Sequence, residues 1–163
     1  MSVKDRPRFW LMKTEPEVFS FDDLMKAPGK TTCWEGVRNY QARNMMRDDF
    51  KVGDEVVIYH SNANPPGVAG FARVVREAYP DPAALDPKSD YFDEKSKADG
   101  KSRWVMVDVQ AVAPAKKLLS LEEIRKTSGL EDMLLLRKGQ RLSIQPVTAA
   151  EWTILSRLAG VKA

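Results

Sequence analysis

The sequence predicts a mixed α+β domain in which one strongly curved or barrel-like sheet carries short helices at its periphery. Runs rich in β-branched residues at 55–60 and 103–112 are typical of strands. Ser20, Ser120 and Thr148 are each followed three residues later by an acidic residue, which predicts capped helix starts. The longest connections between predicted strands do not have the pattern of a regular crossover helix. A doubly wound parallel sheet is therefore not expected.

Composition restricts the possible classes of protein. The 163 residues are enough for one domain with its own core, and 43% of them are hydrophobic. The charged N-terminus lacks the apolar segment of a signal peptide and no apolar run could span a bilayer, so we expect a cytoplasmic protein without a membrane partner. With one cysteine, Cys33, and one histidine, His60, neither an intrachain disulfide nor a structural Cys/His zinc site can form within the monomer. We predict no metal and no cofactor. The net charge of +3 permits an anionic partner. The sequence leaves the oligomeric state open.

The first half of the chain alternates short strands and helices. Residues 9–12 predict a buried strand that ends before Pro16, because proline cannot continue a central ladder. The cap at Ser20 predicts a short helix over residues 21–26. Residues 55–60 read as the next strand after it.

The second half continues the pattern after a long connection. Residues 68–75 predict a strand in which Gly70 marks a bulge or a close backbone contact. Residues 80–102 lose periodicity and predict a long flexible loop, in which only Tyr91 and Phe92 could anchor to the rest of the domain. The remaining expected elements are a strand over 103–112, a helix over 121–126, helical turns over 130–136, a strand over 141–147 and a last helix after Thr148.

Residues 34–46 concentrate the side chains that bind a flat, polar ligand. Trp34 and Tyr40 offer ring faces, and Arg38, Asn39 and Arg43 offer donors that can read base edges or hold phosphate.

The same stretch also predicts a helix over residues 37–49. In it Asn39, Arg43 and Arg47 recur on one side, and Gly36 before it permits a close approach of the backbone to a ligand. The alternative is an ordinary amphipathic helix with a solvated basic face.

Two strand ends carry further polar candidates. Tyr59, His60, Ser61 and Asn62 end one predicted strand, where loops often display binding groups. His60 is equally compatible with a hydrogen-bonded structural role.

Lys13 and Glu15 end the first predicted strand and project from the same face. A surface ion pair of little energetic value is the alternative interpretation.

Taken together, several motifs resemble the EVE domain family over nearly the whole chain, and the chain looks like a stand-alone bacterial version. The resemblance implies a single domain over residues 1–163 with a PUA-like fold: a curved mixed β-barrel of about five to six strands with short peripheral helices. It also implies a relation to YTH and ASCH domains. The matching motifs lie at residues 9–16, 34–44, 59–61, 91–93, 103–104 and 141–147.

The resemblance further implies that the domain binds nucleic acid and recognises a modified base of DNA or RNA in an aromatic pocket. Trp34 and Trp104 are then the expected walls, with Tyr59 as a third ring. The other expected contacts are Asn39, Ser61 and Asn62 for base edges, Arg38, Arg43 and Lys13 for phosphate or a carbonyl, and Tyr40 and His60 beside them.

Three functional hypotheses follow. The first is a non-catalytic reader of modified bases. The second is an enzyme acting on a nucleotide or RNA with His60 or Glu15 as acid–base groups. The third is a protein-interaction module that uses the basic helix face.

Overall fold

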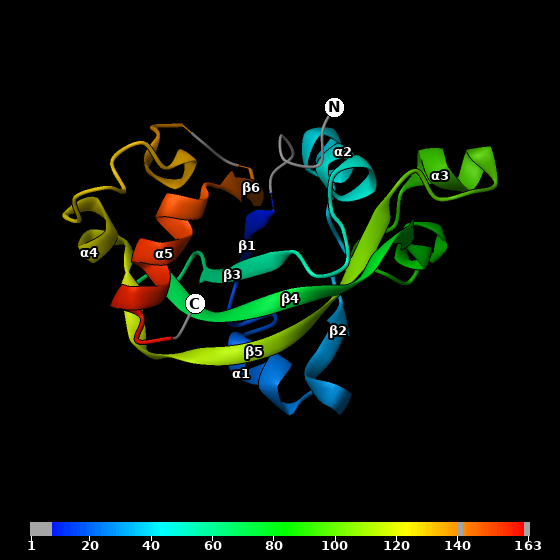
Figure 1. The fold of residues 1–163 in the computed structure, drawn as a ribbon. Helices are drawn as coiled ribbons and strands as arrows, with labels where there is room; N and C mark the ends of the chain where they lie inside the picture. Colours follow the sequence, from blue (N-terminus) through cyan, green and yellow to red (C-terminus); the bar gives the residue numbers. More distant parts are fainter. Residues whose placement is uncertain (1–7, 140–141, 162–163) are drawn as a thin grey trace.

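Six strands form one open mixed sheet in the computed structural model, which describes residues 8–139 and 142–161 (Figure 1). The strand order is β2-β5-β4-β3-β1-β6, and β1 and β3 are parallel while the other neighbours are antiparallel. Because β2 and β6 are its edges, the sheet is not closed, and the expected barrel is corrected to a curved open sheet. The strands are β1 (Phe9–Thr14), β2 (Thr31–Cys33), β3 (Glu55–His60), β4 (Gly67–Pro80), β5 (Val105–Ser120) and β6 (Ile144–Val147).

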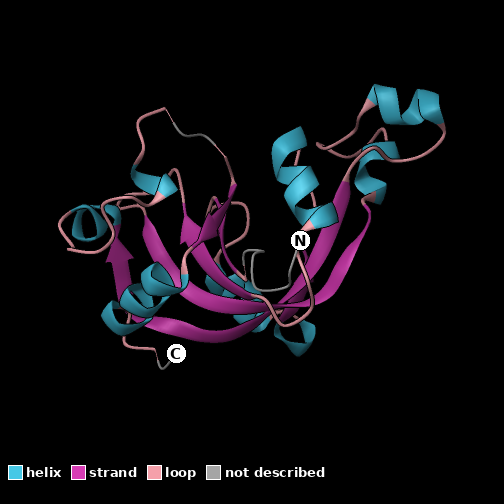
Figure 2. Cartoon of the chain, turned by 45° about the horizontal axis from the view of Figure 1, so that its top comes forward, coloured by secondary structure: helices cyan, strands magenta, loops and turns pink. Residues whose placement is uncertain are grey.

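The curvature comes mainly from the long β4–β5 pair, which bends across the whole molecule in Figure 2. Its register shifts at four places, and such irregularities bend and twist a ladder. One shift ends at Gly70, where a Cβ atom would lie 2.4 Å from the ring of Phe21. The close contact predicted for this glycine is confirmed.

Side chains of the central strands alternate between two hydrophobic cores. Trp10 and Met12 of β1 belong to the core covered by α1 and α2, whereas Leu11 belongs to the core covered by α4 and α5. Strand β3 alternates in the same way, because strand side chains point to opposite faces of a sheet. The helices are α1 (Phe21–Lys26), α2 (Tyr40–Asp48), α3 (Glu94–Asp99), α4 (Leu121–Arg125) and α5 (Ala149–Leu158), with 3₁₀ turns η2 (Pro28–Lys30), η3 (Pro82–Leu85) and η4 (Leu134–Leu136).

The helix starts follow their capping residues. Ser20 and Thr148 form complete capping boxes, and the Ser120 side chain accepts a hydrogen bond from the Glu123 amide, so these three predictions are confirmed. The predicted start of α2 at residue 37 is wrong. Asn39 has extended backbone dihedrals and its side chain accepts from the Ala42 amide, so the helix begins at Tyr40.

The segment between β4 and β5 is more structured than a loop. It contains η3 and α3, and Asp81, Ala84 and Ser96 are buried within it. Strands β4 and β5 are longer than expected, and the short β2 was not predicted. In the described residues, no helix has the length and apolarity that crossing a membrane requires.

Candidate functional site

A cavity of about 500 Å³ opens beside the end of β1. Its walls come from β1, the turn that follows it, β2, the segment 34–38 and two residues distant in sequence. The lining residues are Lys13, Thr14, Glu15, Val18, Phe19, Thr32, Cys33, Trp34, Glu35, Gly36, Val37, Arg38, Tyr91 and Ser143.

Trp34 forms one fixed wall of this cavity. It is 8% exposed, and its backbone amide donates to the carbonyl of Val107 at 2.7 Å. The ring of Phe19 packs edge-on against the indole, with 6.4 Å between ring centroids. The indole is thus anchored in the core and still borders the cavity.

Tyr91 forms a second aromatic wall. Gly36 has a φ of +82°, and a Cβ atom on it would lie 2.6 Å from the Tyr91 ring. Glycine is therefore required here by the tyrosine of the same chain. Gly36 also lines the cavity, so the expectation that its backbone can approach a ligand closely stays a prediction.

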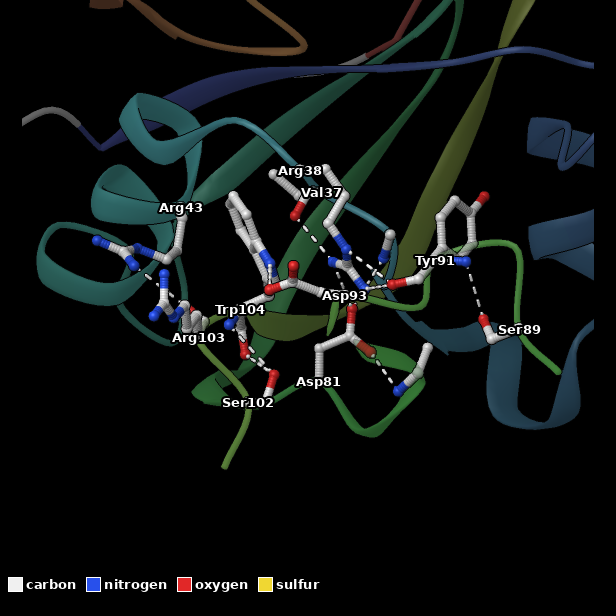
Figure 3. Close-up of polar contacts among 12 residues, drawn as sticks. Val37, Arg38, Arg43, Asp81, Ser89, Tyr91, Asp93, Ser102, Arg103 and Trp104 are labelled. Atoms are coloured by element: carbon white, nitrogen blue, oxygen red, sulfur yellow. Dashed lines mark hydrogen bonds and ion pairs between the residues drawn. The ribbon is translucent and has the colours of Figure 1, made fainter. Parts of the chain in front are cut away.

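Arg38 holds the Tyr91 wall to the segment 34–38 (Figure 3). Its Nε and Nη2 atoms donate to the Tyr91 carbonyl at 3.1 and 2.8 Å, and Nη1 donates to the Val37 carbonyl at 2.9 Å. Nη1 also donates to Oδ2 of Asp81 at 3.1 Å. Arg38 lines the cavity, but these bonds direct its donors into the protein.

Asp81 is the buried centre of this arrangement. Its side chain is fully buried and accepts from the amides of Gly36 at 3.0 Å and Ala83 at 2.9 Å, besides Arg38. A buried carboxylate needs such partners to offset its desolvation. Asp81 therefore fixes the segment 34–38 against the start of the β4–β5 connection.

Polar groups at the ends of the parallel strands β1 and β3 meet beside the cavity. Lys13 and Glu15 both line it, as their shared strand face predicted. Partial burial lowers the pKa of the Lys13 ammonium group. Asn62 donates from Nδ2 to Glu15 Oε1 at 3.2 Å, and the Ser61 amide donates to the Thr14 carbonyl at 2.9 Å. The loop after β3 thus supports the polar side of the cavity without lining it.

Two other residues at the end of β3 have different surroundings. Nε2 of His60 accepts a hydrogen bond from the Phe21 amide at 3.0 Å, and burial lowers the pKa of the imidazole. Tyr59 is buried in the core on the opposite face of the sheet. The structure brings neither of them to the cavity.

Tyr40, Arg43 and Trp104 form a separate cluster, named here the outer ring stack. The two rings stack at 4.6 Å between centroids, and the Arg43 guanidinium lies 4.7 Å from the Tyr40 centroid. Trp104 Nε1 donates to Asp93 at 3.0 Å, and Arg43 donates to the Arg103 carbonyl at 3.1 Å (Figure 3). None of the three lines the cavity.

The sequence argument missed three residues that shape the cavity. Phe19 and Tyr91 supply rings, and Asp81 supplies the buried carboxylate. For Tyr91 the sequence offered two signals: Tyr91 and Phe92 are the rings of an otherwise polar stretch, and residues 91–93 are one of the motifs of the family resemblance. Nothing distinguished Asp81 from the other aspartates around it.

Comparison with known proteins agrees with this fold. The family model described as EVE domain matches residues 8–158. Human thymocyte nuclear protein 1 is 42% identical over 96% of this chain and 76% of that protein. A solved structure of a Leishmania major hypothetical protein is 47% identical, has a TM-score of 0.88 and covers 98% of each chain.

A second solved structure is that of human THYN1 in complex with DNA that contains 5-methylcytosine. It is 42% identical with a TM-score of 0.84, and the match covers 95% of this chain and 99% of that one. Both the family model and these relatives extend over nearly all of the sequence. The chain belongs to the EVE domain family.

Proposed function

We propose that this chain is a non-catalytic nucleic-acid-binding domain that takes one modified base into the cavity beside Trp34 and Tyr91. The observation that carries the proposal is the cavity itself. Two aromatic walls are held rigidly on different segments, and an open space of about 500 Å³ remains at them. That volume lies within the range of roughly 300–1,000 Å³ found for small-molecule sites.

The walls suit the face of a base. Stacking of a base on an aromatic side chain contributes about 1–3 kcal/mol and depends little on which base it is. The apolar side chains of Phe19 and Val37 also line the cavity and can accept a methyl group. Stacking thus supplies affinity, while the apolar part supplies a preference for a methylated base.

The polar lining suits the edge of a base. The Lys13 ammonium can donate to a carbonyl, and the carboxylates of Glu15 and Glu35 can accept from an exocyclic amine. Cytosine presents both kinds of group. The complex of human THYN1 with 5-methylcytosine-containing DNA supports the same choice, so DNA with this base is the first ligand to test.

An enzyme that uses His60 has less support from the geometry. The imidazole accepts a hydrogen bond from the Phe21 amide and does not border the cavity. The protein-interaction hypothesis relies on a free basic face of α2, yet Arg43 and Arg47 donate to Asn44 and Asp48.

Fluorescence anisotropy with labelled oligonucleotides tests the proposal. We expect tighter binding of an oligonucleotide with one 5-methylcytosine than of the same sequence with cytosine. The affinity for both should fall with salt, because phosphate contacts release counterions. His60→Ala should keep the preference for the modified base. Equal affinity for the two oligonucleotides would refute a modified-base reader.

A further inference from the structure

The cavity raises a question about double-stranded partners. A base that stays stacked in a duplex cannot enter a concave pocket, so it must rotate out of the helix. That rotation leaves a gap in the stack. Proteins that unstack bases often insert an apolar side chain between the base steps. A reader of duplex DNA therefore gains from an exposed apolar residue at the rim of its pocket.

Val18 is such a residue. Its exposed fraction of 65% is the highest among the exposed large hydrophobic residues in the part of the chain that the structure describes. It also lines the cavity. The other members of that group, such as Val52 and Val112, do not border the cavity. Among the described residues, the most exposed large apolar side chain thus lies at the cavity rim.

The turn that carries Val18 is held by its own hydrogen bonds. The amides of Val18 and Phe19 both donate to the Glu15 carbonyl at 2.9 Å. The Thr14 hydroxyl donates to the Phe19 carbonyl at 2.6 Å. Phe19, next in the chain, is fixed against Trp34. Val18 therefore projects from an ordered turn, which lowers the entropic cost of inserting it.

The charges of the turn argue against a phosphate-binding role. No lysine or arginine occurs between Lys13 and Lys26, and Glu17 beside Val18 is exposed. A carboxylate at this position repels the DNA backbone. Because the turn is not suited to bind phosphate, the contact with DNA that its tip can make is an apolar contact with the bases.

We propose that Val18 is a wedge that enters the base stack of double-stranded DNA. It fills the gap that the modified base leaves in the stack when that base rotates into the cavity. This inference rests on the proposed function. It adds the duplex as the form of the partner and assigns to Val18 a role separate from contacts inside the cavity.

The test compares Val18→Ser with the unaltered protein on two forms of one 5-methylcytosine oligonucleotide, single-stranded and duplex. We expect Val18→Ser to weaken duplex binding about tenfold, the size that losing the burial of part of a valine predicts. Single-stranded binding should change by less than about twofold, because no stack needs to be opened. A duplex with a mismatch at the modified base should recover part of the loss.

Val52→Ser is the matched control, since Val52 is a turn valine with an exposed fraction of 58% outside the cavity lining. It should leave both affinities unchanged. Equal losses on both forms, or no loss on the duplex, would overturn the wedge. If the unaltered protein prefers the modified base only in single strands, the wedge is refuted and the proposed function stands. If it shows no preference in either form, the proposed function fails as well.

Discussion

The cavity and the outer ring stack contain the same kinds of side chain but arrange them differently. In the outer ring stack, Tyr40 and Trp104 cover each other and Arg43 lies over the pair. In the cavity, Trp34 and Tyr91 border an open space of about 500 Å³. Arg38 lies between the two clusters, 5.6 Å from the Tyr91 centroid and 5.4 Å from that of Trp104.

This difference shows that aromatic and basic residues do not by themselves make a binding site. When two rings stack on one another, each covers one face of the other. When rings are held apart by other contacts, those faces stay open to a ligand. In this protein, the Asp81–Arg38 pair and Gly36 hold Tyr91 in place at the cavity. We therefore propose base binding for the cavity and a structural role for the outer ring stack.

The largest expected effect comes from the carboxylate that holds the cavity wall. Asp81→Ala leaves the Arg38 guanidinium without its buried carboxylate partner, and breaking such a buried pair costs about 3–5 kcal/mol. Urea denaturation measures this change in the free energy of unfolding. The control is Asp99→Ala, which removes a partly exposed partner of Arg103 near the outer ring stack and should lower the free energy of unfolding far less, because exposed ion pairs stabilise little. Equal losses would mean that Asp81 is not the centre of the wall.

Filling the cavity should weaken binding without affecting the outer ring stack. Cys33 is the single cysteine, is exposed and lines the cavity. Partial burial raises the pKa of its thiol, so labelling with a bulky maleimide proceeds best at mildly alkaline pH. We expect the labelled protein to bind 5-methylcytosine DNA at least about tenfold more weakly, a change of ~1.4 kcal/mol. Cys33→Ser protein carried through the same treatment should bind normally, and unchanged binding of the labelled protein would place the base elsewhere.

A matched pair of tyrosine substitutions compares the two clusters directly. Tyr91→Leu removes a ring from the cavity and should weaken binding by about 1–3 kcal/mol, the contribution of one stacked base. Tyr40→Leu removes the 47% exposed ring of the outer ring stack and should change the affinity by less than about twofold, although it too removes a tyrosine ring. Titration of both variants with one labelled oligonucleotide decides between the clusters. The reverse order of effects would assign binding to the outer ring stack.

The smallest effect concerns His60, which belongs to neither cluster. Burial lowers the pKa of its imidazole below the ordinary 6.5, so the unfolded chain binds a proton at a higher pH than the folded protein does. The contribution of His60 to the free energy of unfolding is therefore fully present above pH 6.5. It falls as the pH drops toward the pKa of the imidazole in the folded protein. Melting curves between about pH 7.5 and about pH 5.5, roughly one unit on either side of the ordinary pKa of histidine, measure this fall. His60→Gln should flatten the dependence, and an unchanged pH profile would contradict a structural role of the neutral ring.

Local signals in the sequence identified most of the fold. Ser20 and Thr148 cap their helices as their spacing to an acidic residue predicts, and the β-branched run at 55–60 is a strand. The sequence did not show the three-residue β2, which is too short to have a pattern of its own. Nor did it place the start of α2, where Asn39 looked like a helix residue and is the cap.

The candidate site was harder to predict because its parts meet only through the fold. Trp34, Lys13 and Arg38 were expected near a ligand and do line the cavity. Tyr59 was expected as a third ring, but the alternation of β3 sends it into the other core. Tyr91 and Asp81 reach the segment 34–38 across more than 40 residues of sequence, and no local pattern encodes such a contact.

A crystal structure with a short oligonucleotide that contains one 5-methylcytosine would test the central claim most directly. The account predicts that the methylated base lies inside the cavity with its ring against Trp34 and Tyr91. It would be contradicted by a base that remains in its own stack, or lies against Tyr40 and Trp104, while the cavity stays empty.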